Sequence, residues 1–340
     1  MDISRSRLAL ACVLARPDGG RVARDAARAL LAGGDAESDR AVTEALANRV
    51  PGVEGALARL QWRWSAAGDA DFPAGLAATA DPPLGLFLRG SLPQARAVAL
   101  VGARRATAYG REVAEYLGRE LAAAGVAVVS GMARGVDAAA HRGALAGGGG
   151  TVAVWGAGPD RVYPPEHAEL AGEIAAAGCL LTEYPPGAPP LAHHFPERNR
   201  LIAGLAEAVV VIEADERSGA LITARLALDE GREVLAVPGS VFSRLSAGPN
   251  GLLRAGAAPV LSADDVLAAI GLPPRAAAPG GPEPALLALI PAGEAVTVDR
   301  LAAASGQPVA QVLEGLLALE LAGRVARETD GRYRRSRVTG

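Results

Sequence analysis

The sequence predicts an α/β protein built on a doubly wound, mostly parallel β-sheet. From Ala97 onward, short apolar runs alternate with longer Ala-rich stretches of helical periodicity. The apolar runs are nearly continuous, which is typical of strands that are buried on both faces. Alternating strands and helices of this kind pair in parallel through right-handed crossovers, so the carboxyl ends of the strands lie at one edge of the sheet.

The alternating region predicts six strands and five helices. The strands are Ala97–Val101, Val126–Val129, Thr151–Trp155, Cys179–Thr182, Ala208–Glu213 and Glu233–Val237. The helices are Tyr109–Ala124, Asp137–Ala146, Pro165–Ala177, Arg198–Leu205 and Ala220–Glu230. A further apolar run, Leu84–Arg89, predicts a short strand that leads into this domain, which we place at residues 71–272.

Residues 1–70 are predicted to form a small bundle of short helices. Apolar residues recur at helical spacing through Val22–Ala32 and Val42–Leu60, with glycine and proline breaks between and within them. The run Leu8–Ala15 is too short for a secretory signal and predicts a buried helix turn. No stretch reaches the roughly 18 uninterrupted apolar residues that a membrane span requires.

The C-terminal part is predicted to be a separate small domain. Pro273–Pro284 has the composition of a linker. Residues 285–340 then predict three helices and a hairpin, which is the pattern of a winged helix. The helices are Ala285–Ile290, Thr297–Ala304 and Val309–Ala322, and the hairpin pairs Arg324–Glu328 with Arg332–Arg334 around Asp330-Gly331.

Charge and cysteine content limit the classes of function. The formal net charge is −3, which argues against coating nucleic acid through global charge but leaves room for a local basic groove. All 34 basic residues are Arg, whose planar guanidinium suits bidentate phosphate contacts and stacking on bases. Cys12 and Cys179 lie far apart, so neither a disulfide scaffold nor a thiolate metal site is expected, and a reducing cytoplasm fits.

The ends of the predicted strands carry glycines, arginines and small polar residues. Glycines allow a ligand to approach the backbone closely, and helix N-termini favour anions. We therefore predict a series of phosphate sites along this edge, together with a base stacked on Phe195 at about 1–3 kcal/mol. An anchoring contact of Phe195 with the core is the alternative. The candidate residues are Gly102, Arg104, Arg105, Ser130, Gly131, Arg134, Gly135, Phe195, Arg198, Asn199, Arg200, Ser218 and Gly219.

Metal, cofactor and nucleophile sites are not predicted. Asp137 and His141 lie one helical turn apart, but no third ligand has suitable spacing. Asp137 is better explained as a helix cap and His141 as a hydrogen-bonded, partly buried side chain. The glycines after the strands do not form the dinucleotide fingerprint GxGxxG, and Ser218 has no G-x-S-x-G context.

Taken together, the segments from Val98 to Val260 closely resemble the DNA-processing protein A family, also called the Smf family. The matching segments are VGARRATAYG, SGMARGVDAAAHRGAL, YPPEHAEL, TEYPPG, FPERNRLIAGL, VVVIEADERSGALITARLAL, REVLAVPG and NGLLRAGA. The resemblance extends upstream to Asp69–Gly90 and downstream into LEGLLALELAGRVARETDGRYRR, and it is faintest over the first 65 residues.

The resemblance implies an extended Rossmann-like core that binds single-stranded DNA, protects it during natural transformation and loads the recombinase RecA. It further implies a sterile-alpha-motif-like N-terminal domain, no catalytic reaction, and a homodimer formed around Leu252 and Leu253. The candidate residues up to Arg200 match the family's DNA-contacting positions. Many members have Ser at Ala103 and a basic residue just before the Phe, where this chain has Ala192-His-His.

Two other functions are weighed against this expectation. A nucleotide-metabolising phosphoribohydrolase of a related fold would need a PGGxGTxxE loop, and Glu213–Thr223 lacks that spacing. The winged helix could read duplex DNA through its many arginines, or dock a protein, since Glu314, Glu320 and Glu328 dilute the positive charge.

Overall fold

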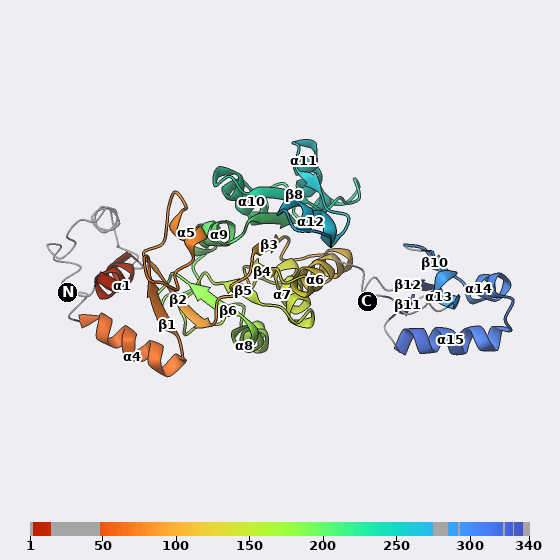
Figure 1. Ribbon diagram of the computed structural model, residues 1–340, viewed down its shortest axis with the longest axis horizontal. Coiled ribbons are helices and arrows are strands. Elements are labelled where there is room, and N and C mark those ends of the chain that lie inside the picture. The colour runs from red at the N-terminus through yellow and green to blue at the C-terminus, as the bar shows by residue number, and fades with distance from the viewer. Residues whose placement is uncertain are drawn as a thin grey trace. The chain divides into compact units, whose positions relative to one another are not determined.

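The computed structural model describes residues 3–14, 48–274, 285–291, 293–321, 324–328 and 330–335. The chain divides into two compact units, Met1–Pro274 and Arg275–Gly340 (Figure 1). None of the helices in these ranges is long and apolar enough to cross a membrane.

The first unit is built on a nine-stranded sheet with the order β1-β2-β6-β5-β4-β3-β7-β8-β9. The strands are β1 (Arg63–Ala66), β2 (Gly85–Gly90), β3 (Ala97–Val101), β4 (Ala127–Ser130), β5 (Thr151–Val154), β6 (Cys179–Thr182), β7 (Ala208–Val211), β8 (Glu233–Ala236) and β9 (Ala258–Pro259). In the order of the sheet, the strands β6, β5, β4, β3, β7, β8 and β9 are all parallel. At one side, β2 pairs antiparallel with β6, and β1 pairs antiparallel with β2. The prediction of a doubly wound, mostly parallel sheet is confirmed.

Helices cover both faces of this sheet (Figure 1). One face carries α5 (Ala74–Ala77), α9 (His194–Leu205) and α10 (Gly219–Asp229). The other carries α6 (Ala108–Ala123), α7 (Val136–Ala146), α8 (Ala168–Ala177) and α12 (Ala263–Ala269). A further helix, α11 (Ala247–Arg254), lies between β8 and β9 in the chain.

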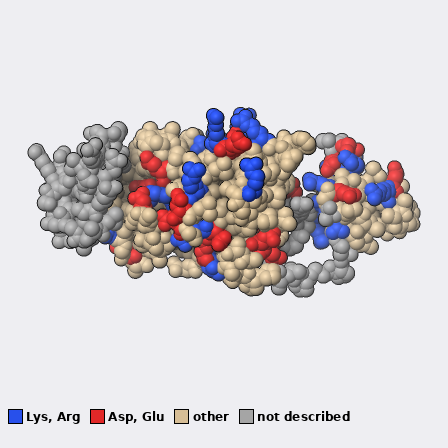
Figure 2. Space-filling model, turned by 90° about the horizontal axis from the view of Figure 1, so that it is seen from above, with Lys and Arg blue, Asp and Glu red and all other residues tan. Residues whose placement is uncertain are grey.

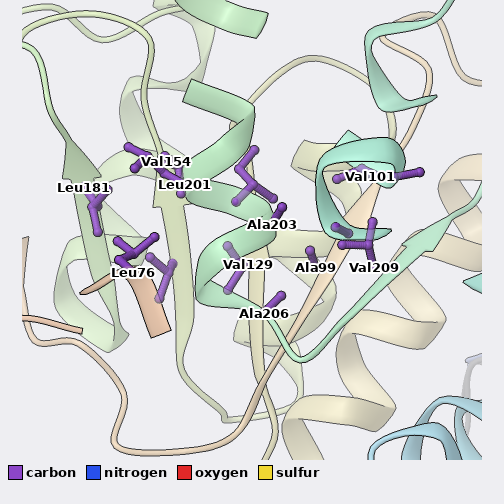
Figure 3. Close-up of a cluster of buried hydrophobic side chains, with 14 of the residues drawn as sticks. Leu76, Ala99, Val101, Val129, Val154, Leu181, Leu201, Ala203, Ala206 and Val209 are labelled. Carbon is purple, nitrogen blue, oxygen red and sulfur yellow. The ribbon is translucent and has the colours of Figure 1, made fainter. Parts of the chain in front are cut away.

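The strands are apolar on both sides because both sides are core. In β3, Ala99 and Val101 belong to the cluster under α9 and α10, whereas Val98 and Leu100 belong to the cluster under α6 and α7. Figure 3 shows the first cluster, in which Leu201 of α9 lies among strand side chains. The continuous apolar runs of the sequence thus follow from two-sided burial.

The N-terminal region differs from expectation in one respect. Helices α1 (Ile3–Leu14) and α4 (Val50–Leu60) agree with the prediction, and Leu8 and Cys12 are buried as expected. Strand β1, however, lies within residues 1–70, where only helices were predicted. Its four residues are too few to show a strand period, and it is held by pairing with β2 and by contact of Trp64 with Phe87. The expected helix Val22–Ala32 lies outside the described residues, so a sterile-alpha-motif-like domain stays a prediction.

The second unit has the predicted winged-helix elements. They are α13 (Ala285–Ala288), β10 (Ala295–Val296), α14 (Val298–Ser305), α15 (Val309–Leu321), β11 (Val325–Arg327) and β12 (Tyr333–Arg335). The strands form a small sheet in the order β10-β12-β11, of which β10 was not predicted. Leu301, Val312 and Leu316 are fully buried in its core. Most of the expected linker, residues 275–284, lies outside the described residues.

Candidate nucleic-acid interface

The candidate site lies at the carboxyl edge of the sheet, the edge where the parallel strands end. Strand order reverses between β3 and β7, which is the position where open α/β sheets bind ligands. A pocket of about 190 Å³ opens there. Its lining includes Gly102 and Arg104 after β3, Ala133 and Asp137 after β4, Phe195, Arg198 and Asn199 of α9, and Ser218, Gly219 and Thr223 around the start of α10.

Arg104 and Phe195 form the mouth of this pocket. The guanidinium carbon of the exposed Arg104 lies 5.0 Å from the centre of the Phe195 ring, in cation–π geometry. The Phe195 ring also contacts Tyr163, with the ring centres 5.3 Å apart. Phe195 is half-buried and belongs to the first turn of α9, which starts at His194 rather than at Arg198 as predicted. The site therefore offers an aromatic surface and a cation side by side.

The loop from Gly131 to Gly135 is fixed by the geometry of its own backbone. Gly135 has φ +77°, and a Cβ there would lie 2.2 Å from the carbonyl oxygen of Ala103. The buried carboxylate of Asp137 accepts hydrogen bonds from the N–H groups of Gly131 and Ala133, both at 3.2 Å. These contacts place the loop against the segment after β3. They give a structural role to Gly131 and Gly135, which the sequence analysis named as candidate ligand contacts.

Arg198 was predicted to contact DNA, but the structure buries it. Its side chain is 4 % exposed, and its guanidinium donates hydrogen bonds to the carbonyls of Gly131, at 2.7 Å, and of Val154. Burial lowers the pKa of Arg198 to about 10. Burial also raises the pKa of Asp137, and the positive charge of Arg198 opposes that rise. Arg198 thus ties together the ends of β4 and β5 at the wall of the pocket.

Three more candidate side chains are engaged within the protein. The buried Ser130 hydroxyl donates to the carbonyl of Leu100 at 2.7 Å. The buried Asn199 amide donates to the carbonyl of Gly219 at 3.3 Å and accepts from Arg198.

Arg200 forms ion pairs with Asp81 and Glu183. Its charge is therefore already balanced by two carboxylates. Ser130, Asn199 and Arg200 thus all make contacts within the protein, although Asn199 also lines the pocket and Nη1 of Arg200 has no hydrogen-bond partner among the described residues.

The start of α10 presents backbone donors to the pocket. Ser218 caps the helix by accepting a hydrogen bond from the N–H of Ala220 at 3.3 Å. Gly219 is exposed, and a Cβ there would have no atom within 4 Å. An 11-residue helix carries partial positive charge at this end, so an anion is favoured there.

The exposed cations at the edge are fewer than predicted. Arg104, Arg105 and Arg134 are exposed, whereas Arg198 and Arg200 are not. Arg134 pairs with Glu166, and both side chains remain about half exposed. On the face shown in Figure 2, arginine and acidic side chains are interspersed. Among the candidate residues, the exposed positive charge is therefore confined to Arg104, Arg105 and Arg134.

The residues that were considered for metal binding or catalysis form hydrogen bonds within the protein. The buried His141 ring lies 2.7 Å from the Thr151 hydroxyl through Nδ1, and burial lowers its pKa to about 3. The buried Glu213 carboxylate accepts the backbone N–H and the hydroxyl of Thr107 at 2.9 and 2.6 Å. No group of three or more potential metal ligands occurs among the described residues.

Three further residues differ from the sequence reasoning. Leu252 and Leu253, which the resemblance places at a homodimer contact, are half-buried and lie on α11, a helix that was not predicted. Tyr163, which contacts Phe195, was missed as a site residue, although its position after the third predicted strand was the available signal.

Comparisons with known proteins agree with this geometry. Residues 63–271 match the family model "DNA recombination-mediator protein A", and residues 271–331 match that of the DprA winged helix domain. Protein Smf of Escherichia coli is 41 % identical over 285 residues, which cover 78 % of this chain and 76 % of the relative.

Two solved structures are also similar. DNA processing protein A (DprA) from Streptococcus pneumoniae has 35 % identity and a TM-score of 0.62, over 78 % of this chain and 93 % of that one. DNA processing protein A from Helicobacter pylori, described for its single-stranded DNA binding mode, has 30 % identity and a TM-score of 0.56, over 62 % and 95 %. This chain belongs to the DNA recombination-mediator protein A family, the DprA/Smf family of DNA-processing proteins.

Proposed function

We propose that this chain binds single-stranded DNA in the cytoplasm, along the carboxyl edge of its sheet, without catalysing a reaction on it. The observation that carries the proposal is the exposed Arg104 guanidinium above the Phe195 ring, at the mouth of a pocket at the strand-order reversal. A base can stack on an aromatic ring whatever its sequence, while a neighbouring arginine holds a phosphate.

The other exposed residues at the site supply the remaining contacts with the DNA. Arg105 and Arg134 supply further charges, and the N-terminus of α10 at Ser218 and Gly219 supplies backbone donors for a phosphate. Gly102 lines the same pocket. A Cβ there would lie 2.6 Å from the side chain of Val136, so glycine is required at this position. We leave Ser130, Arg198 and Asn199 out of the contacting set because they form hydrogen bonds within the protein, and Arg200 because it is already paired with two carboxylates.

Strand protection, delivery to RecA and dimer formation are proposed from membership of the family. We propose that the bound strand is protected from nucleases and delivered to the RecA recombinase, and that two copies associate around Leu252 and Leu253. Membership of the family and the single-stranded DNA named for the Helicobacter pylori relative support this proposal. The occupied Glu213 carboxylate gives no support to the phosphoribohydrolase alternative.

The test is a titration of a labelled single-stranded oligonucleotide, followed by fluorescence anisotropy. Arg104→Ala removes a charge-assisted phosphate contact worth about 1.5–3 kcal/mol, so the affinity is expected to fall about 10- to 100-fold. Arg225→Ala is the matched control, because Arg225 is an exposed arginine in the middle of α10. Equal affinity of wild type and Arg104→Ala, or equal affinity for single and double strands, would contradict the proposal.

Oligomeric state and RecA delivery need their own measurements. Light scattering of Leu253→Arg is expected to show a smaller mass than wild type, and an unchanged mass would reject this interface. The rate at which RecA coats an oligonucleotide is expected to rise with wild type and not with Arg104→Ala.

A further inference from the structure

Exposed aromatic residues are confined to one edge of the molecule. The chain has three Trp, five Tyr and four Phe, and all of them lie in described ranges. Only Tyr109, Tyr163 and Phe242 among them are exposed, at 45, 39 and 97 %. They follow β3, β5 and β8, so all three lie where parallel strands reach the carboxyl edge. Single exposed apolar residues are common, but this shared location indicates a common role.

Phe242 is presented on a structured turn. Asn250 holds the turn by donating to the carbonyl of Gly239 at 3.0 Å and accepting from its N–H at 3.2 Å. The Phe242 N–H donates to the Ser240 hydroxyl at 3.3 Å. These hydrogen bonds fix the backbone that carries the nearly fully exposed Phe242 ring, which reduces the backbone part of the entropy cost of binding.

The turn is also joined to the proposed DNA site. The Tyr109 hydroxyl donates to the carbonyl of Pro238 at 3.2 Å, which connects the start of α6 with the segment after β8. Arg244 pairs with Asp215 at 2.6 Å, which connects the turn with the loop that leads to Ser218. Phe242 therefore belongs to the same edge as Arg104 and not to a separate surface.

A phosphate contact is available beside the ring. The Arg244 side chain is 85 % exposed, so its ion pair with Asp215 is solvated and contributes little to stability. A phosphate can therefore replace Asp215 as the partner of Arg244 at little cost. Strand β8 lies two strands from β3, which places the two strand ends about 10 Å apart.

We propose that Phe242 and Arg244 form a second subsite for single-stranded DNA, in which a base stacks on Phe242 and an adjacent phosphate contacts Arg244. Tyr109 follows the same β-strand as Arg104 and contacts Pro238 next to the turn of Phe242, so it would provide a further aromatic surface for the DNA strand. The subsite rests on the proposed function, since it extends the path of the same strand along the carboxyl edge.

The test compares oligonucleotides of two lengths, about 5 and about 15 nucleotides, within the range of site sizes for single-strand binding folds. Phe242→Ala is expected to lower the affinity for the longer strand about 5- to 150-fold, which corresponds to one stacked base, and to leave the shorter strand unaffected. Phe242→Trp is expected to retain the affinity, and its indole emission to fall as the longer strand is added. Leu228→Ala, an exposed apolar residue at the far end of α10, is the control.

The outcomes separate this inference from the proposed function. If wild type fails to bind DNA, the proposed function fails. If wild type binds, Arg104→Ala binds weakly and Phe242→Ala binds both lengths like wild type, only the second subsite is overturned. A changed mass of Phe242→Ala in light scattering, with unchanged affinity for the longer strand, assigns Phe242 to a contact between copies and also overturns the subsite.

Discussion

Arg198→Ala should destabilise the first unit rather than remove a DNA contact. The substitution leaves the carbonyls of Gly131 and Val154 without their donor, and it removes a buried positive charge that opposes the rise of the Asp137 pKa. Leaving a buried hydrogen-bonding group without its partner costs about 1–3 kcal/mol, and here two carbonyls lose theirs. Because a domain has only about 5–15 kcal/mol of stability, the midpoint of urea unfolding should fall markedly.

The loss should depend on pH in a direction set by Asp137. Burial raises the folded-state pKa of Asp137 above the value of about 3.9 expected in the unfolded chain. A raised carboxyl pKa adds stability below the unfolded-state pKa, and this contribution is lost as the pH rises through the folded-state pKa. Without Arg198 the folded-state pKa rises further, so the difference from wild type should be smaller at pH 4 than at pH 8.

The assay is urea unfolding of wild type and Arg198→Ala at both pH values, with Arg225→Ala as an exposed control. The double variant Asp137→Asn/Arg198→Ala should remove the pH-dependent part of the loss, since no buried charge is left behind. An Arg198→Ala protein that is as stable as wild type but binds DNA weakly would refute the reasoning and return Arg198 to the contacting set.

Three other substitutions test separate parts of the structure. Gly135→Ala places a Cβ 2.2 Å from a backbone oxygen at a φ of +77°, so thermal unfolding should show a loss of about 2 kcal/mol or more, and an unchanged Tm would contradict this. Glu213→Gln should cost about 1–3 kcal/mol in urea unfolding, because a donor NH2 replaces one of the two oxygens that accept hydrogen bonds from Thr107, while DNA affinity stays within about twofold. In the winged helix, Leu316→Asp should expose residues 285–335 to limited proteolysis because Leu316 is fully buried, whereas Leu313→Asp, at a position 44 % exposed, should resist like wild type.

The fold was predictable where an element was long enough to show a period. The six strands of the alternating region and the helix around Val312 and Leu316 are found within a few residues of their expected positions. Strands β1, β9 and β10 were missed because two to four residues carry no recognisable alternation, and their partners in the sheet determine them.

The candidate site was predictable only in part. Arg104 and Phe195 followed from their positions after strands, and they do come together. The burial of Arg198 could not be predicted, because its carbonyl partners Gly131 and Val154 lie 67 and 44 residues away in the chain. The sequence places an arginine near a strand end, but only the packed structure shows whether its guanidinium meets solvent or backbone.

The short strand β9 limits how this protein can aggregate. An exposed sheet edge is normally a template on which the strand of another molecule can add. Here the sheet ends, on that side, in the two residues Ala258–Pro259, and proline has no N–H to offer. Backbone-mediated growth into extended sheets or fibrils is therefore disfavoured at this side, even though the sheet behind it is long and strongly apolar.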